Sequence, residues 1–243
     1  DWNWIVSQNN VGAEIENISD NFSLIAVQGP KAVVVLQELT SIDLNKIKFY
    51  HFQVGDFAGL NNIIISATGY TGSGGFELYV PNQSAETVWE AIFNTKIQPP
   101  VLPTGLAARD TLRLEMGYCL YGNDISDETS PIAAGLGWVT KFNKDFIGKE
   151  IIQNQKNEGP EDKLIAFELI ERGIPRKDYE IENYSGELIG KVTSGTMGPS
   201  VQKAIGLGYI KSEYAKMGET IYLKIRNKKI PAVIVKLPFF KNS

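Results

Sequence analysis

A glycine-rich segment at residues 69–75, flanked by Tyr70 and Glu77, is the first place where residue types suggest ligand chemistry. Glycine lets a ligand approach the backbone closely, and a carboxylate accepts hydrogen bonds from such a ligand. The segment lacks the Gly-Lys-Ser/Thr ending of a phosphate-binding loop, and it leads into a strand-like run at residues 76–80 where such a loop opens a helix. A tight connection between strands is the simpler interpretation, and a ligand-binding loop is the alternative.

Arg109 and Arg113 form a second candidate, because they lie four residues apart in a helix expected from residue 104 to about 116. Residues at this spacing share one helix face, where like charges repel unless negative charge lies between them. Trp138 adds a flat aromatic surface further along the chain. Spacing alone does not bring Tyr70, Glu77, Arg109 and Trp138 into one cleft.

Other kinds of catalytic site are excluded by composition, because the chain has one cysteine, Cys119, and one histidine, His51. Neither an internal disulfide nor a zinc site built from several Cys and His ligands can be assembled, and no nucleophile turn lies near His51. Cys119 is expected to be a buried, inert thiol in an apolar segment. No metal site is predicted, since four scattered acidic residues are interpreted as solvated turn residues: Asp20, Asp124, Asp127 and Glu128.

The chain has 243 residues, 43% of them hydrophobic, and a net charge of −4. This composition is typical of a globular protein. This balance gives no general attraction to nucleic acid or to an anionic membrane, and no apolar run is long enough to cross a bilayer. One basic run is interpreted as a solvated hairpin, with contact to an acidic partner as the alternative: Lys224, Arg226, Lys228 and Lys229.

The elements that position these residues form an α+β pattern followed by an all-β tail. At residues 76–80, Phe76 and Leu78 alternate with Glu77, so we expect Glu77 to point away from the core. A polar segment at residues 153–162 is the expected linker, and after it only short strands follow. The other expected strands are 22–28, 48–56, 62–68 and one beginning at 135–139, and the other expected helices are 31–39 and 84–93.

Seven segments, in order along the chain, resemble the aminomethyltransferase (T-protein) family of the glycine cleavage system. The most specific are the Gly-Tyr-Thr-Gly and Gly-Phe-Glu motifs at residues 69–77 and the Gly-Leu-Ala-Ala-Arg-Asp helix that begins at residue 105. The remaining segments are residues 24–32, 120–125, 135–138, 190–200 and 205–209.

The resemblance implies a multidomain, folate-binding aminomethyltransferase body with a C-terminal barrel-like domain. It implies an incomplete first domain at residues 1–21 and 126–160, a folate-binding domain at 22–125 and a β-barrel domain at 161–243. The implied enzyme takes the aminomethyl group from the lipoyl arm of H-protein, releases ammonia and passes the one-carbon unit to tetrahydrofolate. The implied compartment is the bacterial cytoplasm, or the mitochondrial matrix for a eukaryotic protein.

Tetrahydrofolate-binding roles are implied for four residues. Glu77 is expected to bind the amino-pyrimidine edge of the pterin and Arg109 to act nearby as a fixed cation, while Tyr70 and Trp138 wall the ring system. Two departures from the family pattern adjoin these residues, namely Ala67 in place of arginine and Ser73-Gly74 in place of Glu-Asp.

No catalytic residue is assigned, because the family's essential aspartate corresponds to a position before Asp1. The chain is therefore expected to be a fragment that binds folate weakly and does not turn over. Two alternatives are a folate-binding domain of a sarcosine- or dimethylglycine-type demethylase, in which the same fold is fused to a flavin domain, and a folate-binding accessory protein of iron–sulfur assembly. The first is disfavoured because nothing flavin-like is found in this sequence, and the second because residues 144–150 lack the cysteine motif of that group.

Overall fold

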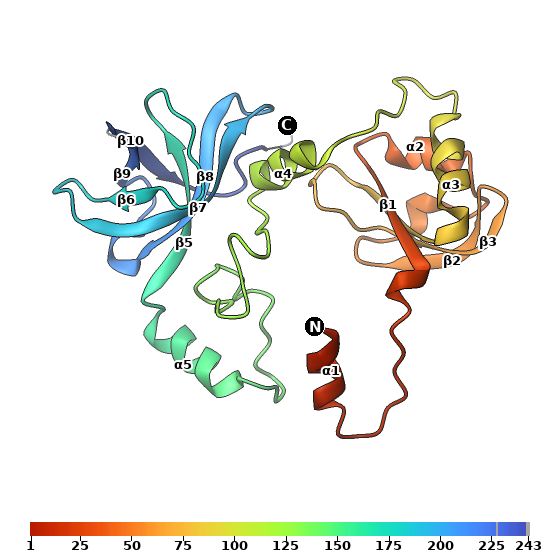
Figure 1. Cartoon of the computed structure of the whole chain (residues 1–243), viewed down its shortest axis with the longest axis horizontal. Coiled ribbons are helices and arrows are strands. Elements are labelled where there is room, and N and C mark those ends of the chain that lie inside the picture. The colour runs from red at the N-terminus through yellow and green to blue at the C-terminus, as the bar shows by residue number, and fades with distance from the viewer. Residues whose placement is uncertain (227, 242–243) are drawn as a thin grey trace. The chain divides into compact units, whose positions relative to one another are not determined.

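The computed structural model describes residues 1–226 and 228–241, which form two compact units. The first unit is Asp1–Thr104, and the second begins at Gly105 and holds the rest of the described chain. Each unit contains its own buried apolar core. Figure 1 labels the helices and strands of both units.

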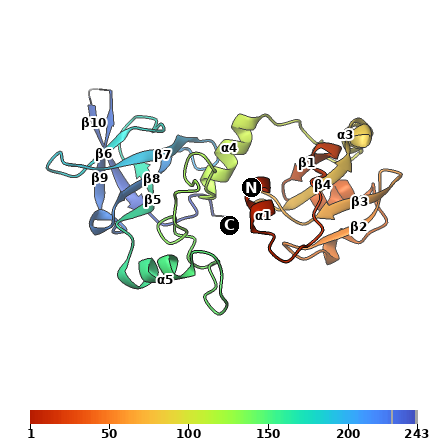
Figure 2. The same ribbon diagram turned by 60° about the horizontal axis from the view of Figure 1, so that its bottom comes forward.

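A four-stranded antiparallel sheet with the strand order β1-β4-β3-β2 organises the first unit. The buried side chains of α2 and α3 join those of the strands in one core, so both helices cover the same face of the sheet. Figure 2 shows the four strands side by side. The elements of this unit are α1 (Trp2–Gln8), η1 (Ser19–Asn21), β1 (Phe22–Gln28), α2 (Ala32–Gln37), η2 (Leu44–Lys46), β2 (Phe52–Phe57), β3 (Leu60–Ser66), β4 (Gly75–Pro81), η3 (Asn82–Ser84) and α3 (Ala85–Phe93).

Strand β4 shows why the sheet has one buried and one open face. Phe76, Leu78 and Val80 are buried, whereas Glu77 and Tyr79 between them are only half-buried. Successive side chains of a strand point to opposite faces, so the apolar set faces the helices and Glu77 faces away from them. The predicted orientation of Glu77 relative to the core is confirmed.

A closed six-stranded barrel forms most of the second unit, with the strand order β10-β5-β8-β7-β6-β9 (Figure 1). Closure pairs β9 with β10, which leaves no unpaired strand edge. The elements of this unit are α4 (Leu106–Glu115), α5 (Lys149–Glu158), β5 (Asp162–Leu169), β6 (Glu180–Glu182), β7 (Leu188–Gly198), β8 (Lys203–Lys211), η4 (Ser212–Tyr214), β9 (Thr220–Ile225) and β10 (Lys228–Val235).

The interior of the barrel is filled by branched and aromatic side chains, with Phe167 fully buried among them. A Cβ atom at Gly206 on the neighbouring strand would lie 2.4 Å from Cζ of Phe167. The glycine therefore makes the space that this large ring occupies. The predicted all-β tail with a barrel-like form is confirmed, as is the mixed helix and strand class of the chain.

Two expectations about local structure are wrong. Residues 135–139 form turns instead of entering a strand, and α5 overlaps the segment expected to be a linker. Helix α5 buries none of its residues, so its sequence lacks the apolar periodicity by which a helix is recognised. The domain boundaries expected at residues 22, 126 and 161 remain predictions.

Among the described residues, no helix combines the length and the apolar content needed to span a membrane.

Candidate functional site

The glycine-rich loop between β3 and β4 is built around the side chain of Gln28, the last residue of β1. Its Nε2 atom donates to the carbonyl oxygens of Thr68 at 3.2 Å and Phe76 at 3.3 Å. Its Oε1 atom accepts from the Thr71 hydroxyl at 3.1 Å, and the backbone N–H of Gly29 donates to Gly74 at 2.9 Å. One amide side chain thus ties the start, the middle and the end of the loop to β1.

Two glycines are required where the loop closes on Gln28. A Cβ atom at Gly69 would lie 1.9 Å from Oε1 of Gln28, and one at Gly75 would lie 2.3 Å from the carbonyl oxygen of Val27. Gly75 also has φ +132°, which side-chain-bearing residues rarely adopt. The loop joins two antiparallel neighbours and opens no helix, so the strand-connection interpretation is confirmed and a phosphate-loop geometry is absent from it.

Glu77 lies in the middle of the open face of the sheet. The strand register places Phe52, Ser66, Glu77 and Ala26 in one row across β2, β3, β4 and β1. The next row is Val54, Ile64, Tyr79 and Leu24.

This open face is apolar around the carboxylate. Phe52, Val54 and Leu24 expose 62%, 53% and 51% of their surfaces, so three large apolar side chains of the sheet lie on its exposed face. Ala67, by contrast, is buried in the core on the opposite face from Glu77. The Ala67 departure from the family pattern therefore lies on the side of the sheet that faces the helices.

Thr68 orients the Glu77 carboxylate. Its hydroxyl donates a short hydrogen bond to Oε2 of Glu77 and lies 3.0 Å from the hydroxyl oxygen of Ser66. Thr68 follows β3 directly and continues its alternation, so its side chain shares the open face with Ser66 and Glu77. Of the predicted site residues, Tyr70 lies in the same loop and is half-buried.

Arg109 and Trp138 belong to the second unit. Arg109 is exposed near the start of α4, and Trp138 exposes 69% of its surface in a turn. Tyr70 lies in the loop that leads into β4, the strand that carries Glu77. The shared cleft expected for Glu77 and Arg109 remains a prediction, because the two residues lie in separate units.

Arg113, one turn beyond Arg109, has a different environment, because it is buried with 1% of its surface exposed. Its Nη1 atom lies 2.7 Å from Oδ2 of Asp124, and its Nε atom donates to Oδ1 of Asp110 at 2.8 Å. Nη2 donates to the hydroxyl of Ser194 on β7 at 2.9 Å. The carboxylates of Asp110 and Asp124 therefore supply the negative charge that was expected near two arginines on one helix face.

The interpretation of Asp124 as a solvated turn residue is wrong. Its carboxylate is buried and accepts from the hydroxyls of Thr193 at 2.5 Å and Ser194 at 2.9 Å, and from the backbone N–H of Leu120 at 2.9 Å. A buried carboxylate with a cationic partner and several donors is a structural group. The local sequence did not reveal this, because two of the donors, Thr193 and Ser194, lie 69 and 70 residues further along the chain.

Cys119 lies beside this network. Burial and the nearby Asp124 carboxylate raise the pKa of its thiol to about 11. A thiol with this pKa stays protonated at neutral pH and is a poor nucleophile, in agreement with the expected inert cysteine. Burial also raises the pKa of the Tyr209 phenol, whose hydroxyl donates to the Asp124 carbonyl at 2.9 Å.

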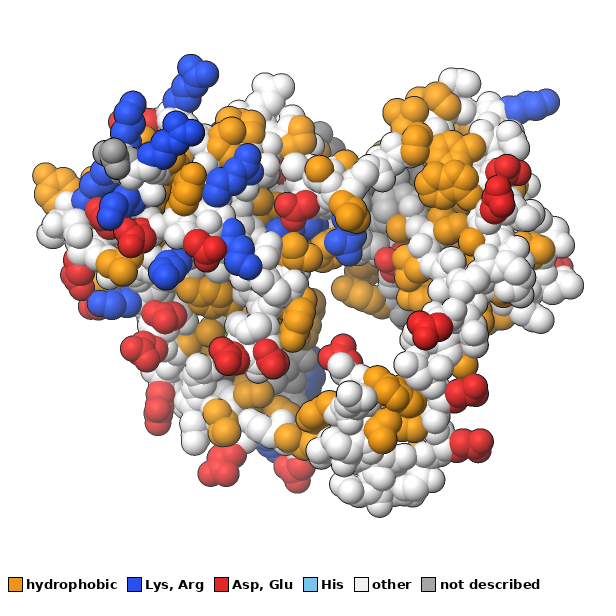
Figure 3. Space-filling view, viewed as in Figure 1, with side chains coloured by type: hydrophobic (Ala, Val, Ile, Leu, Met, Phe, Trp, Pro, Cys, Tyr) orange, Lys and Arg blue, Asp and Glu red, His pale blue; other side chains and the backbone are white. Residues whose placement is uncertain are grey.

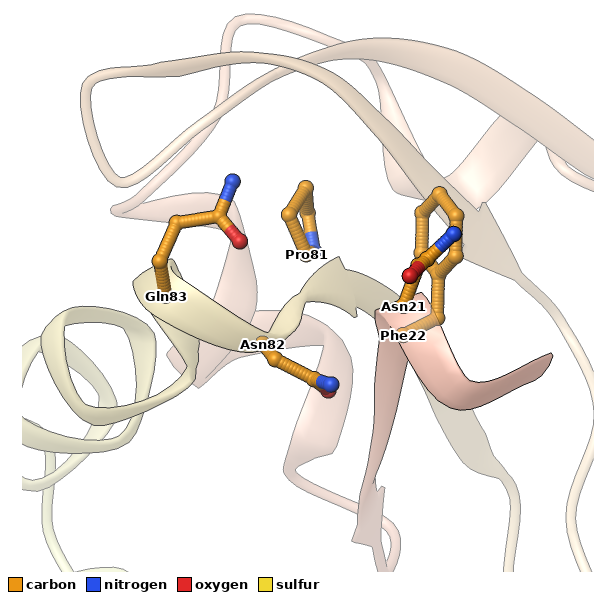
Figure 4. Close-up of a pocket in the computed structure, with 5 residues that line it drawn as sticks. All are labelled: Asn21, Phe22, Pro81, Asn82 and Gln83. Carbon is orange, nitrogen blue, oxygen red and sulfur yellow. The ribbon is translucent and has the colours of Figure 1, made fainter. Parts of the chain in front are cut away.

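A shallow hollow of about 430 Å³ lies at the far end of the same sheet from the glycine loop (Figure 4). Within it, Asn82 accepts from the Ser23 hydroxyl at 2.8 Å and donates to the Asp20 carbonyl at 2.6 Å. These bonds fasten the start of β1 to the end of β4, so the asparagine has a structural role. The residues around the hollow are Asn21, Phe22, Pro81, Asn82 and Gln83.

Two lysines of the basic run near the C-terminus pair with acidic residues of β6. Lys224 lies 2.9 Å from Glu180, and Lys229 lies 3.5 Å from Glu182. Lysine and arginine side chains lie among acidic ones on this unit in the view of Figure 3. The basic residues are exposed on the β9–β10 hairpin, in agreement with the solvated-hairpin interpretation, and contact with an acidic partner remains a prediction. No group of three or more potential metal ligands occurs within the part of the chain that the structure describes.

Sequence reasoning missed Gln28 and Thr68, which lie among the residues of the site. Gln28 ends a strand and Thr68 precedes the glycines, but neither position shows which atoms it contacts. The alternation of residues 63–68 indicates that Thr68 shares a face with Ser66. The pairing of that face with Glu77 depends on strand register, which the local pattern does not contain.

Two family profiles cover most of the chain. The GCVT N-terminal domain matches residues 1–144, and the glycine cleavage T-protein C-terminal barrel domain matches residues 163–241. The chain belongs to the glycine cleavage T-protein family.

Individual relatives of this T-protein family member agree with that identification. It is 57% identical over 243 residues to the aminomethyltransferase of Bacteroides thetaiotaomicron and 46% identical over 240 residues to that of Halothermothrix orenii. The matches cover 99% and 98% of this chain and 67% of each relative.

A solved T-protein structure gives the same result. The glycine cleavage system aminomethyltransferase T of Bartonella henselae superposes with a TM-score of 0.82 at 33% identity, covering 90% of this chain and 60% of that one. The chain thus spans about two thirds of the length of its aminomethyltransferase relatives. The predicted family and fold are confirmed, and the relatives' names favour the transferase over the accessory and demethylase-type alternatives. This family uses tetrahydrofolate as a substrate.

Proposed function

We propose that this chain carries the tetrahydrofolate-binding surface of a glycine cleavage aminomethyltransferase. In the reaction, the carbon of an S-aminomethyl group on the lipoyl arm of H-protein forms bonds to N5 and N10 of tetrahydrofolate. Its bonds to sulfur and to the amino nitrogen break. The two hydrogens lost from N5 and N10 are balanced by those gained by the released thiol and ammonia, so no oxidant or reductant is needed.

The observation that carries the proposal is the position of Glu77. It is the carboxylate in the middle of an open, apolar sheet face, and it is held there by Thr68 beside the glycine-rich loop. A flat heterocycle with an N–H-rich edge fits such a surface, because its rings contact apolar side chains while its donors reach the carboxylate.

Each half of a pterin has a matching feature on this surface. The amino-pyrimidine edge presents neighbouring N–H donors, and a carboxylate accepts two parallel hydrogen bonds. Phe52 and Val54 supply exposed apolar area on the same face as Glu77. Tyr70 supplies an aromatic ring from the adjoining loop.

Arg109 and Trp138 complete the proposed binding set. We assign Arg109 a fixed positive charge near the ligand and Trp138 an aromatic wall, because both lie in segments that match the family motifs. The proposed partner is lipoylated H-protein, and the proposed compartment is the cytoplasm, as expected for the bacterial relatives of this chain.

Binding of a stable reduced folate, 5-formyltetrahydrofolate, tests the proposal by isothermal titration calorimetry. Glu77→Gln is expected to weaken binding about tenfold or more, because a neutral amide replaces a charged acceptor and presents a donor to the ligand's donors. Glu90→Gln, an exposed carboxylate on α3, is the matched control and is expected to bind as the parent does. Equal affinity of Glu77→Gln and the parent chain overturns the proposed site.

Arg109→Met and Trp138→Ala extend the same titration to the second unit. Both are expected to weaken binding, because one removes a charge and the other removes aromatic contact area. Lys163→Met, a change of charge at the start of the barrel, serves as their control. Unchanged affinity in both variants restricts the site to the first unit and refutes these two assignments.

A further inference from the structure

We propose that Thr68 is a positioning residue that sets the specificity of this site for pterins with a 2-amino group. This inference rests on the proposed function, since it concerns how the Glu77 carboxylate is presented to the ligand. Thr68 does not need to touch the ligand. It acts by fixing the carboxylate that does.

The partners of the Thr68 hydroxyl define the group to which it donates its hydrogen bond. Its hydroxyl has one proton and lies within reach of Oε2 of Glu77 and the hydroxyl of Ser66. The Glu77 carboxylate is the stronger acceptor, so the Thr68 hydroxyl donates its hydrogen bond to Glu77. The Ser66 hydroxyl can then donate to the Thr68 oxygen. Ser66, Thr68 and Glu77 then form a short chain of hydrogen bonds on the open face.

The backbone of Thr68 is held independently of its side chain. Nε2 of Gln28 donates to the Thr68 carbonyl at 3.2 Å, and the same amide group contacts the far end of the loop at Phe76. Thr68 cannot shift without breaking this bond. The hydroxyl is therefore fixed relative to β4, the strand that carries Glu77.

A fixed carboxylate matters because a free glutamate side chain has three rotatable bonds. When a ligand has to immobilise such a side chain, the lost rotamer freedom is a cost that weakens binding. Thr68 meets this cost in the folded protein and leaves acceptor capacity for the ligand, since a carboxylate has about four acceptor sites. The arrangement favours a ligand whose donors match the preset orientation.

The pterin edge that donates to the oriented Glu77 carboxylate carries N3–H and the 2-amino group. A ligand without the 2-amino group makes one bond fewer to Glu77 and depends less on the orientation of the carboxylate. The Thr68 hydroxyl does not contact the ligand, yet its loss is expected to change the relative affinities for ligands with and without the 2-amino group.

Thr68→Val tests this directly, because valine has the shape of threonine without the hydroxyl. The probes are 5-formyltetrahydrofolate and its analogue with a methyl group in place of the 2-amino group. Thr68→Val is expected to weaken binding of the first about tenfold and of the second less than twofold, while Thr68→Ser restores parent affinity. Thr95→Val, which removes a hydroxyl bonded to the Ile92 carbonyl in the same unit, is the control.

The outcomes separate this inference from the proposed function. If Glu77→Gln weakens binding and Thr68→Val does not, the positioning role is overturned and the folate site stands. If Glu77→Gln has no effect, the proposed site itself is wrong. Equal losses for both ligands in Thr68→Val, or a failure of Thr68→Ser to restore affinity, show a merely structural role and also overturn the inference.

Thermal unfolding gives an independent check. Thr68→Val is expected to melt with the parent chain, because valine suits a position that continues a strand. Gln28→Met is expected to lower both the melting temperature and the affinity, because it releases the loop from β1. A parallel fall in melting temperature and affinity in Thr68→Val counts against the inference.

Discussion

Arg113 and Asp124 form an ion pair of 2.7 Å in which the two side chains expose 1% and 0% of their surfaces. The pair joins helix α4 to the turn that follows it, and both members also bond to Ser194 on β7. It therefore fastens the helix that carries Arg109 to the barrel. Removing one member leaves a charge in a site that water does not reach.

Asp124→Asn is expected to destabilise the second unit by about 3–5 kcal/mol, because the Arg113 charge then lies buried without its main counter-charge. Urea unfolding followed by circular dichroism measures the change. Replacing both residues by apolar ones, as in Arg113→Met with Asp124→Leu, is expected to cost less than the sum of the single changes.

Asp110→Asn is the matched control for this pair. Asp110 also contacts Arg113, but half of its side chain is exposed, so its loss is expected to cost about 0–1 kcal/mol. Asp124→Asn with a free energy of unfolding equal to that of Asp110→Asn contradicts a structural role for the pair.

Cys119 is expected to resist alkylation in the folded chain. Burial, and secondarily the Asp124 carboxylate, raise the pKa of the thiol to about 11, so very little thiolate is present at pH 8. The rate of reaction with iodoacetamide is expected to be low at pH 8 and to rise steeply as the pH approaches 11. The chain unfolded in urea is the control and is expected to react as an ordinary thiol.

The raised pKa of Cys119 also predicts how the stability of the folded chain changes with pH. The folded pKa lies above the ordinary value of 9.0, so folding favours the neutral thiol. Its contribution is fully present below pH 9 and is lost as the pH rises to about 11. Cys119→Ala is expected to remove this part of the alkaline loss of stability. Rapid alkylation of the folded chain at pH 8 contradicts a raised pKa for this thiol.

Gly75→Ala is expected to disrupt the glycine loop more than Gly74→Ala does. Both positions have positive φ, but a Cβ atom meets nothing within 4 Å at Gly74 and meets the Val27 carbonyl oxygen at 2.3 Å at Gly75. The additional clash is expected to cost the first unit about 1–3 kcal/mol in the free energy of unfolding.

Folate binding is the second readout for this pair of variants. Gly75→Ala moves the strand that carries Glu77 and is expected to weaken binding of 5-formyltetrahydrofolate, whereas Gly74→Ala is expected to retain most of it. Equal unfolding energies and equal affinities for the two variants refute this account of the loop.

Local sequence patterns determined much of the first unit and the character of the second. The alternation at residues 76–80 predicted which face of β4 is buried, because side-chain direction in a strand depends only on position. After residue 162 only short apolar strands follow one another, and this pattern predicted an all-β tail. The family motifs around residues 69–77 and 105–115 indicated the family, and the two profiles confirm it.

Local patterns failed where an element buries little or lacks regular structure. Helix α5 has no buried residue, so nothing in its sequence distinguished it from a linker. The segment at residues 135–139 has the apolar residues Leu136, Trp138 and Val139, which are compatible with a strand, yet it forms turns. In both cases the missing signal is periodic burial.

The sequence by itself determined the residue types available at the site, the face of β4 on which Glu77 lies and the shared helix face of Arg109 and Arg113. Only the tertiary structure decided that Arg113 is buried against Asp124 while Arg109 is exposed, and that Thr68 meets Glu77. These contacts join segments 9 to 81 residues apart, through strand register and the packing of α4 on β7. Local periodicity fixes the direction of a side chain, whereas the partner it meets depends on how distant segments pack.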